Sequence, residues 1–177
     1  HQAESGIKYD IIIEPQMSFG TGHHETTSMM VELIMDLQVK GREILDMGTG
    51  TGILAILAQM MGAGRILAID NDEWAYKNTM NNISLNGIKG FDVIQGDVSS
   101  IKNRIFDIIF ANINRNILLR DIVYYADALK EGGLLLLSGF YSEDLESIDN
   151  LAGKNGMAQE RKLLLNNWIA VQYRKKN

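Results

Sequence analysis

Residues 44–52, which read I-L-D-M-G-T-G-T-G, decide the fold of this chain. Two apolar residues lead into an aspartate, three glycines then alternate with two threonines, and a strongly apolar stretch follows at residues 53–61. This order predicts a short buried strand, a tight turn and the start of a helix, because glycine adopts turn conformations that other residues avoid. A turn of this kind presents backbone N–H groups and a helix N-terminus to a bound ligand.

Strands and helices alternate on both sides of this turn. Apolar and β-branched runs predict strands at residues 44–47, 65–70, 91–95, 106–111 and 134–137. Helical spacing of apolar residues predicts helices at residues 28–37, 53–61, 73–85, 116–129 and 143–151. The alternation predicts an α/β fold with a doubly wound, mainly parallel sheet that helices cover on both faces.

The C-terminal part of the chain adds an antiparallel pair. Residues 157–165 and 168–174 are predicted strands, and Asn166-Asn167 between them can supply the positive φ angles of a hairpin turn. Near the N-terminus, a β-branched run at residues 9–13 is typical of a short strand, and the only proline, Pro15, ends it.

The overall composition is that of a globular domain. The chain has 177 residues, of which 46% are hydrophobic and 22% charged, so one domain spanning residues 1–177 is expected. A net charge of −5 argues against a broad electrostatic contact with nucleic acid. Cysteine is absent, which excludes disulfides and thiolate chemistry, and no apolar run resembles a membrane span or a signal peptide. A cytoplasmic location is therefore expected.

Polar residues gather where the predicted strands end. Asp46 and the glycines lie at the end of the strand predicted at residues 44–47, and Asp70 ends the strand at residues 65–70. Asp97 comes shortly after the strand at residues 91–95, and Asn112 comes directly after the strand at residues 106–111. Ligands bind beyond the carboxyl ends of the strands in an open parallel sheet. These strand ends are therefore expected to form one ligand-binding crevice.

The spacing of the glycines narrows the choice of ligand. A dinucleotide fingerprint is G-x-G-x-x-G, and Ile53 stands where its third glycine would be. That departure counts against a nicotinamide or flavin enzyme. An aspartate two residues before the first glycine of G-x-G-x-G is instead typical of doubly wound enzymes that use S-adenosylmethionine. A structural turn without a ligand is the plain alternative.

Three strand-end residues each have a functional and a structural interpretation. The Asp70 carboxylate can accept hydrogen bonds from both hydroxyls of a ribose, or it can cap the following helix, as Asp72 could. Asp97 could accept a hydrogen bond from an adenine amino group, although aspartate is common at strand ends. The Asn112 carboxamide can accept a hydrogen bond from a nucleophilic amine, or it can cap the next helix.

The loop at residues 19–27, F-G-T-G-H-H-E-T-T, could close over the ligand as a lid. Residues 26–28 could equally be helix caps. His23 and His24 are adjacent, so their side chains do not share a helix face, and no partner cluster with metal-ligand spacing accompanies them. No metal site is expected. Trp168 in the last strand is interpreted as a packing residue.

Four stretches together resemble the catalytic domain of the large-subunit ribosomal protein L-eleven methyltransferase family (PrmA). They are P-Q-M-S-F-G-T-G-H-H-E-T-T before the glycine turn, L-D-M-G-T-G-T-G-I-L-A-I at the turn, A-I-D-N-D-E-W-A with N-N-I-S-L-N-G, and I-I-F-A-N-I-N. G-G-L-L-L-L-S-G supports them, and the resemblance runs from about Glu14 to the C-terminus. The glycine motif alone indicates a class I methyltransferase, whereas F-G-T-G-x-H-x-T-T with A-N-I narrows it to this family.

The resemblance implies a seven-stranded S-adenosylmethionine-dependent methyltransferase fold, and N-methylation of lysine side chains and of the N-terminal amine of a large-subunit ribosomal protein. It carries cofactor contacts over to Thr27, Gly48, Asp70 and Asn112. The full set of candidate cofactor-binding residues is Phe19, Thr27, Asp46, Gly48, Gly50, Asp70, Asp97 and Asn112. Asn112 is also the candidate catalytic residue: it is expected to orient the amine while water takes the proton.

The chain departs from the family pattern in three respects. Thr49 stands in place of the usual cysteine, and His23 stands where threonine is frequent. Family members also carry an N-terminal substrate-recognition domain, which this chain, starting at His1, is expected to lack. The alternative functions are a class I methyltransferase for another protein or a small molecule, a nicotinamide-dependent oxidoreductase, and a non-catalytic cofactor-binding domain.

Overall fold

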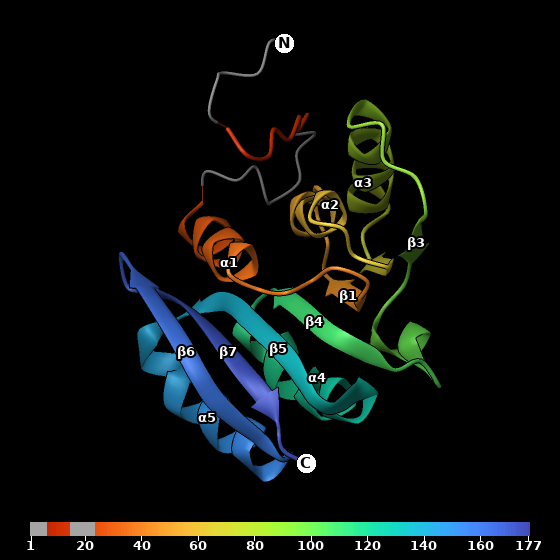
Figure 1. The fold of residues 1–177 in the computed structure, drawn as a ribbon. Coiled ribbons are helices and arrows are strands. Elements are labelled where there is room, and N and C mark those ends of the chain that lie inside the picture. The colour runs from red at the N-terminus through yellow and green to blue at the C-terminus, as the bar shows by residue number, and fades with distance from the viewer. Residues whose placement is uncertain (1–6, 15–23) are drawn as a thin grey trace.

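The structure is a computed structural model that describes residues 7–14 and 24–177. Its centre is a seven-stranded sheet with the strand order β3-β2-β1-β4-β5-β7-β6 (Figure 1). The strands are β1 Glu43–Met47, β2 Arg65–Asp70, β3 Phe91–Gln95, β4 Phe106–Asn112, β5 Leu129–Tyr141, β6 Met157–Leu165 and β7 Trp168–Lys175. The helices are α1 Glu25–Met35, α2 Ile53–Met60, α3 Glu73–Leu85, α4 Arg115–Ala128 and α5 Leu145–Lys154, with short 3-10 segments η1 Val98–Ile101 and η2 Ser142–Asp144.

The sheet separates two apolar cores. Strands β1 to β5 pair in parallel, whereas β7 pairs antiparallel with both β5 and β6. Successive strand residues point to opposite faces, so Ile44 joins the core under α1 and α2 while Leu45 joins the core under α4 and α5. Figure 1 shows α1, α2 and α3 on one side of the sheet and α4 and α5 on the other. The predicted doubly wound α/β fold is confirmed.

The C-terminal hairpin is also confirmed. Strands β6 and β7 pair from end to end, and the residues between them, Asn166 and Asn167, have φ angles of 47° and 68°. Asparagine tolerates this left-handed region better than most residues, which is why the Asn-Asn pair forms the turn.

Among the helices in the described ranges, none is long and apolar enough to cross a membrane.

Strand β5 starts earlier than the sequence predicted. The prediction was a helix to residue 129, ended by Gly132-Gly133, and a strand only at residues 134–137. In the structure α4 ends at Ala128, and β5 begins at the next residue and passes through both glycines. Gly132 has a φ angle of 72°, and the pairing of β5 with β4 shifts register near its start. The glycines therefore form an irregularity within a strand and do not terminate a helix.

Residues 9–13 do not form a strand, contrary to the prediction. The side chain of Asn86 donates to the Ile12 carbonyl at 2.7 Å and accepts the Ile12 N–H at 2.9 Å. The Asn82 amide oxygen accepts the Glu14 N–H at 3.0 Å. The side chains of Asn82 in α3 and of Asn86, which caps the C-terminus of α3, thus satisfy backbone groups that a neighbouring strand would otherwise satisfy. Pro15, the predicted end of this run, lies outside the described residues.

Candidate active site

The glycine turn leads from β1 directly into α2. Gly48, Gly50 and Gly52 have φ angles of 71°, 58° and 82°, a region that other residues seldom adopt. The Gly48 N–H donates to the Ile69 carbonyl at 2.8 Å, which ties the turn to β2. A Cβ atom on Gly48 would lie 2.2 Å from Cγ2 of Ile113. The turn therefore has no room for a side chain at its first glycine, and the predicted strand, turn and helix are confirmed.

Asp70, at the end of β2, connects the glycine turn to the start of α3. Its Oδ2 accepts the Gly50 N–H at 3.0 Å, and its Oδ1 accepts the Asp72 N–H at 3.0 Å. Asp72 in turn caps α3 by accepting the N–H groups of Trp74 and Ala75. The helix-capping role considered for Asp70 thus belongs to Asp72. Each carboxylate oxygen of Asp70 keeps a further lone pair with which it can accept a hydrogen bond from a ligand.

A cavity of about 740 Å³ lies at the carboxyl ends of the central strands. The candidate residues that line it are Thr27, Gly48, Gly50, Asp70, Asp97 and Asn112. They come from α1, from the glycine turn and from the ends of β2, β3 and β4, so the structure brings these separate stretches of sequence together. The volume lies within the range of small-molecule and cofactor sites, roughly 300–1,000 Å³. Phe19 and most of the expected lid loop lie outside the described residues.

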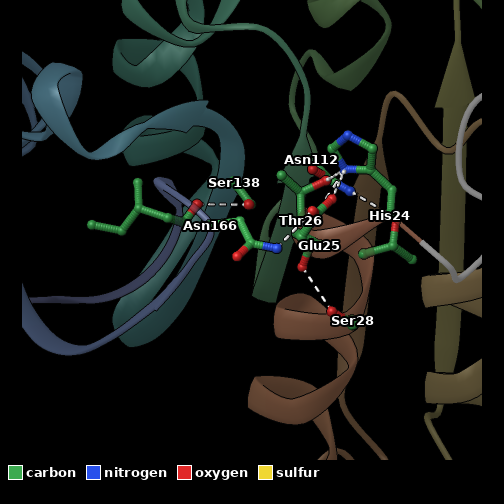
Figure 2. Close-up of polar contacts among 9 residues, drawn as sticks. His24, Glu25, Thr26, Ser28, Asn112, Ser138 and Asn166 are labelled. Atoms are coloured by element: carbon green, nitrogen blue, oxygen red, sulfur yellow. Dashed lines mark hydrogen bonds and ion pairs between the residues drawn. The ribbon is translucent and has the colours of Figure 1, made fainter.

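Asn112 lies at the end of β4, beside the first turn of α1 (Figure 2). Its Nδ2 donates to Oγ1 of Thr27 at 3.4 Å. The following helix, α4, is capped by Asn114, whose Oδ1 accepts the Ile117 N–H at 3.1 Å. Helix capping therefore does not explain Asn112, and its carboxamide contributes to the wall of the cavity.

Asp97 sits at the cavity wall next to η1. Its Oδ1 accepts the N–H of Ser99 at 2.9 Å, and the hydrogen bonds from Ser99 lower the pKa of the Asp97 carboxyl. The carboxylate is therefore charged at neutral pH and able to accept a hydrogen bond from a ligand. The structure also shows the local reason for an aspartate here, because it begins the 3-10 turn.

The start of α1 is set by His24 and not by residues 26–28, which the sequence offered as caps. The His24 Nδ1 atom accepts the Thr26 N–H at 3.3 Å and lies 2.9 Å from Thr26 Oγ1. The Glu25 carboxylate accepts a hydrogen bond from Asn166 at 3.1 Å, which joins α1 to the tip of the hairpin (Figure 2).

Over the part of the chain that the structure describes, no group of three or more His, Cys, Asp and Glu residues could hold a metal ion.

Both tryptophans of the chain line the cavity, although neither was predicted as a site residue. Trp168, interpreted as a packing residue, does pack, with ring centroids 4.1 Å from Tyr141 and 5.0 Å from His24, but it also forms part of the cavity wall. The register of β5 against β7 places Trp168 opposite Tyr141. Trp74 reaches the cavity from the first turn of α3 and is 66% exposed. Its position four residues after Asp70, at the start of the next helix, is the signal that could have found it.

Asp46 lies beneath the glycine turn and is not among the residues that line the cavity. It is only 1% exposed, and the Thr49 hydroxyl donates to its Oδ2 at 2.7 Å. Burial raises the pKa of the Asp46 carboxyl to about 7, and the charge of Asp70 adds to this effect, while the hydrogen bond from Thr49 opposes it. Asp46 therefore holds the turn from below, apart from the surface that a ligand would touch.

The raised pKa of Asp46 has a consequence for stability. Between about pH 4 and pH 7 the folded state keeps a proton on Asp46 that the unfolded chain has lost, so the free energy of unfolding falls as pH rises through this range. Asp46→Asn removes that contribution, and at pH 8 the variant is expected to be more stable than the wild type by an amount on the order of 4 kcal/mol or less.

The measurement is urea unfolding of both proteins at intervals from pH 4 to pH 8. The difference in free energy between variant and wild type is expected to be small at pH 4 and to grow towards pH 7. Asp92→Asn, at a 56% exposed side chain on β3, is the matched control and is expected to show no such growth. A difference for Asp46→Asn that stays flat over the whole range would contradict the assignment.

The profile of one protein family, described as ribosomal protein L11 methyltransferase (PrmA), matches residues 2–176. The chain belongs to this family. The ribosomal protein L11 methyltransferase of Porphyromonas gingivalis is 48% identical over 174 residues, which cover 98% of this chain and 60% of that protein. The Bacteroides thetaiotaomicron protein of the same name is 49% identical, again over 174 residues, with 62% of its length covered. This chain thus spans about three-fifths of the length of these curated relatives.

Solved structures agree with the membership of the PrmA family. The ribosomal protein L11 methylase of Lactobacillus delbrueckii subsp. bulgaricus superimposes with a TM-score of 0.83 at 31% identity, over 88% of this chain and 81% of that chain. A methyltransferase from Pyrococcus furiosus gives a TM-score of 0.75 at 19% identity, over 94% and 90% of the two chains, and shows the shared fold alone. The chain therefore has the class I methyltransferase fold that the resemblance implied.

Proposed function

We propose that residues 1–177 form the catalytic domain of an S-adenosylmethionine-dependent methyltransferase, which methylates lysine side chains and the N-terminal amine of a large-subunit ribosomal protein. The observation that carries the proposal is that one cavity is lined by Asp70, by Asn112 and by a glycine turn without room for a side chain. Membership of the PrmA family supports the choice of substrate. A cytoplasmic location belongs to the proposal, because ribosomal proteins are found there.

The residues around the cavity fit S-adenosylmethionine. Gly48 and Gly50 line the cavity and carry no side chains, so a ligand can approach their backbone closely. Asp70 offers carboxylate oxygens to the ribose hydroxyls, and Asp97 offers them to the adenine amino group. Thr27 and Asn112, which are hydrogen-bonded to each other, line the part of the cavity next to α1.

S-adenosylmethionine supplies a methyl group on a positively charged sulfur, so its leaving group is already good. The task of the protein is to align a neutral amine and to exclude water. A free lysine amine has a pKa of ~10.4 and an N-terminal amine of ~8, so the amine must lose a proton before it can attack. Asn112 and nearby backbone carbonyls accept hydrogen bonds from this amine and point its lone pair into the cavity, while the proton leaves to water.

The proposal is tested by calorimetry with S-adenosylhomocysteine and with NAD. Only the first is expected to bind, because Ile53 occupies the position of the third glycine of a dinucleotide turn. Methyl transfer from tritiated S-adenosylmethionine to purified ribosomal protein L11 is then measured for this chain and for the longer Porphyromonas gingivalis relative. Tritium in the amines of ribosomal protein L11 would identify a methyltransferase. Binding of S-adenosylhomocysteine without methyl transfer by either protein would indicate a non-catalytic domain. Binding of NAD would indicate an oxidoreductase.

Asp70→Ala is expected to weaken the binding of S-adenosylhomocysteine by roughly 10- to 100-fold, which corresponds to the loss of hydrogen bonds to a charged group. The variant loses the ribose acceptor and also the contacts that hold the Gly50 and Asp72 N–H groups. Asp92→Ala, which removes an exposed carboxylate from the neighbouring strand β3, is the control and is expected to bind like the wild type. An unchanged dissociation constant for Asp70→Ala would refute the ribose assignment.

A further inference from the structure

Trp74 is a large aromatic residue that remains exposed to solvent in the fold. It lies in the first turn of α3, its side chain is 66% exposed, and it forms part of the cavity wall. Burial of a tryptophan side chain is strongly favourable in water, and aromatic rings at cavity walls supply flat apolar surface for ligands. The exposure of Trp74 at this place therefore points to a ligand that covers it.

The backbone of Trp74 is fixed relative to Asp70 by two successive hydrogen bonds. The Asp72 N–H donates to Asp70 Oδ1 at 3.0 Å, and the Trp74 N–H donates to Asp72 Oδ1 at 2.6 Å. The Asp70 carboxylate is itself held by the Gly50 N–H at 3.0 Å. The backbone from which the indole extends is thus held at a defined position relative to the Asp70 carboxylate, which is proposed to bind the ribose. A base attached to that ribose would therefore lie close enough for the indole to contact it.

The indole of Trp74 has two kinds of neighbour, the Lys77 side chain and the cavity. The Lys77 Nζ atom lies over the ring, 5.6 Å from its centroid, and is ion-paired with Glu73. Lys77 is not among the residues that line the cavity, whereas Trp74 is. Gly96 and Asp97 at the end of β3 line the same cavity, and the Gly96 N–H donates to the Asp70 carbonyl at 2.8 Å. Trp74 and the end of β3 therefore belong to the wall of one cavity, and a planar group bound there would have both beside it.

We propose that the free face of Trp74 stacks on the adenine base of the ligand, and that Trp74 thereby gives the site its preference for a purine nucleoside. This inference rests on the proposed function, because it takes the ligand to be S-adenosylmethionine or its product. Stacking of a base on an aromatic side chain contributes roughly 1–3 kcal/mol when it is measured by alanine substitution. Trp74 is thus a cofactor-contact residue on the wall of the cavity, and it takes no part in the transfer itself.

The test is a binding cycle between two proteins and two ligands. Calorimetry compares S-adenosylhomocysteine with S-ribosylhomocysteine, which lacks the base, in wild type and in Trp74→Ala. The variant is expected to bind S-adenosylhomocysteine about tenfold more weakly and to bind S-ribosylhomocysteine like the wild type. The preference for the purine ligand therefore shrinks in Trp74→Ala. Trp74→Phe, which keeps an aromatic ring, is expected to retain most of this preference.

Two further measurements complete the test. Tyr124→Ala removes a 51% exposed aromatic ring from α4, outside the cavity, and is expected to leave both dissociation constants unchanged. In Trp168→Phe, Trp74 is the only tryptophan, and its fluorescence is expected to be quenched as S-adenosylhomocysteine binds. Equal weakening of both ligands in Trp74→Ala, or unquenched fluorescence at saturation, would overturn the stacking and leave the proposed function intact. Failure of the wild type to bind S-adenosylhomocysteine would overturn both.

Discussion

The Gly48→Ala variant is expected to lose about a hundredfold in affinity for S-adenosylhomocysteine and about 2–4 kcal/mol in its free energy of unfolding. Two effects add at this position. The new Cβ would lie 2.2 Å from Cγ2 of Ile113, and the φ angle of 71° is one that alanine adopts only under strain. Relief of the clash requires the turn to move away from Ile113, which displaces the backbone of residues 48–50 at the cavity wall. Calorimetry and thermal unfolding measure the two losses separately.

Gly87→Ala is the matched control for the backbone strain. Gly87 has a φ angle of 63°, but a Cβ atom there would meet nothing within 4 Å. This variant is expected to lose about 1 kcal/mol of stability through strain alone and to bind like the wild type. A Gly48→Ala/Ile113→Ala double variant removes the obstructing methyl group and is expected to recover part of the affinity. Wild-type affinity in Gly48→Ala would show that the turn does have room for a side chain.

The Asn112→Ala variant is expected to lower the turnover number by about a hundredfold at saturating S-adenosylmethionine, because the amine acceptor loses its orienting partner. Structure and stability are expected to change little. The cap of α4 is Asn114, and among the described residues the Asn112 side chain donates one long hydrogen bond, of 3.4 Å, to Thr27. The measurement is initial-rate methyl transfer, with the affinity for S-adenosylhomocysteine determined alongside it.

Asn86→Ala is the control for the loss of a carboxamide. The Asn86 side chain forms two hydrogen bonds with the backbone of Ile12 and does not line the cavity. We expect this variant to unfold more easily, by about 1–2 kcal/mol, and to keep its turnover number. Near-normal turnover in Asn112→Ala would assign the orientation of the amine to other groups, such as backbone carbonyls.

The fold could be predicted from the sequence because its local signals agree with one another. Strands β2, β3 and β6 and helix α3 have the predicted bounds, since each is an apolar or helically spaced run between glycine, asparagine or aspartate residues. The failures occur where a local signal has two structural uses. Gly132-Gly133 resembles the end of a helix, yet the pairing of β5 with β4 draws these glycines into a strand.

The candidate site could be predicted only as far as strand ends reveal it. Asp70, Asp97 and Asn112 follow strands directly, so the rule that ligands bind at carboxyl ends was enough to place them at the cavity. Trp168 is different, because only the antiparallel register of β7 brings it to the cavity wall beside His24. Asp46 shows the opposite case: it precedes the turn in the sequence, but its buried side chain binds the Thr49 hydroxyl and does not line the cavity.

The position of β7 between β5 and β6 affects how the chain is built on the ribosome. Strand β7 is synthesised after both of its neighbours, and in the sheet that the described residues form, β6 pairs with β7 alone. While β7 is still inside the exit tunnel, β5 keeps an open edge and β6 has no partner, a state that favours contacts with other nascent chains. Trp168 is the first residue of β7. Pairing of β7 with its neighbours therefore completes the sheet and at the same time brings Trp168 to the cavity wall.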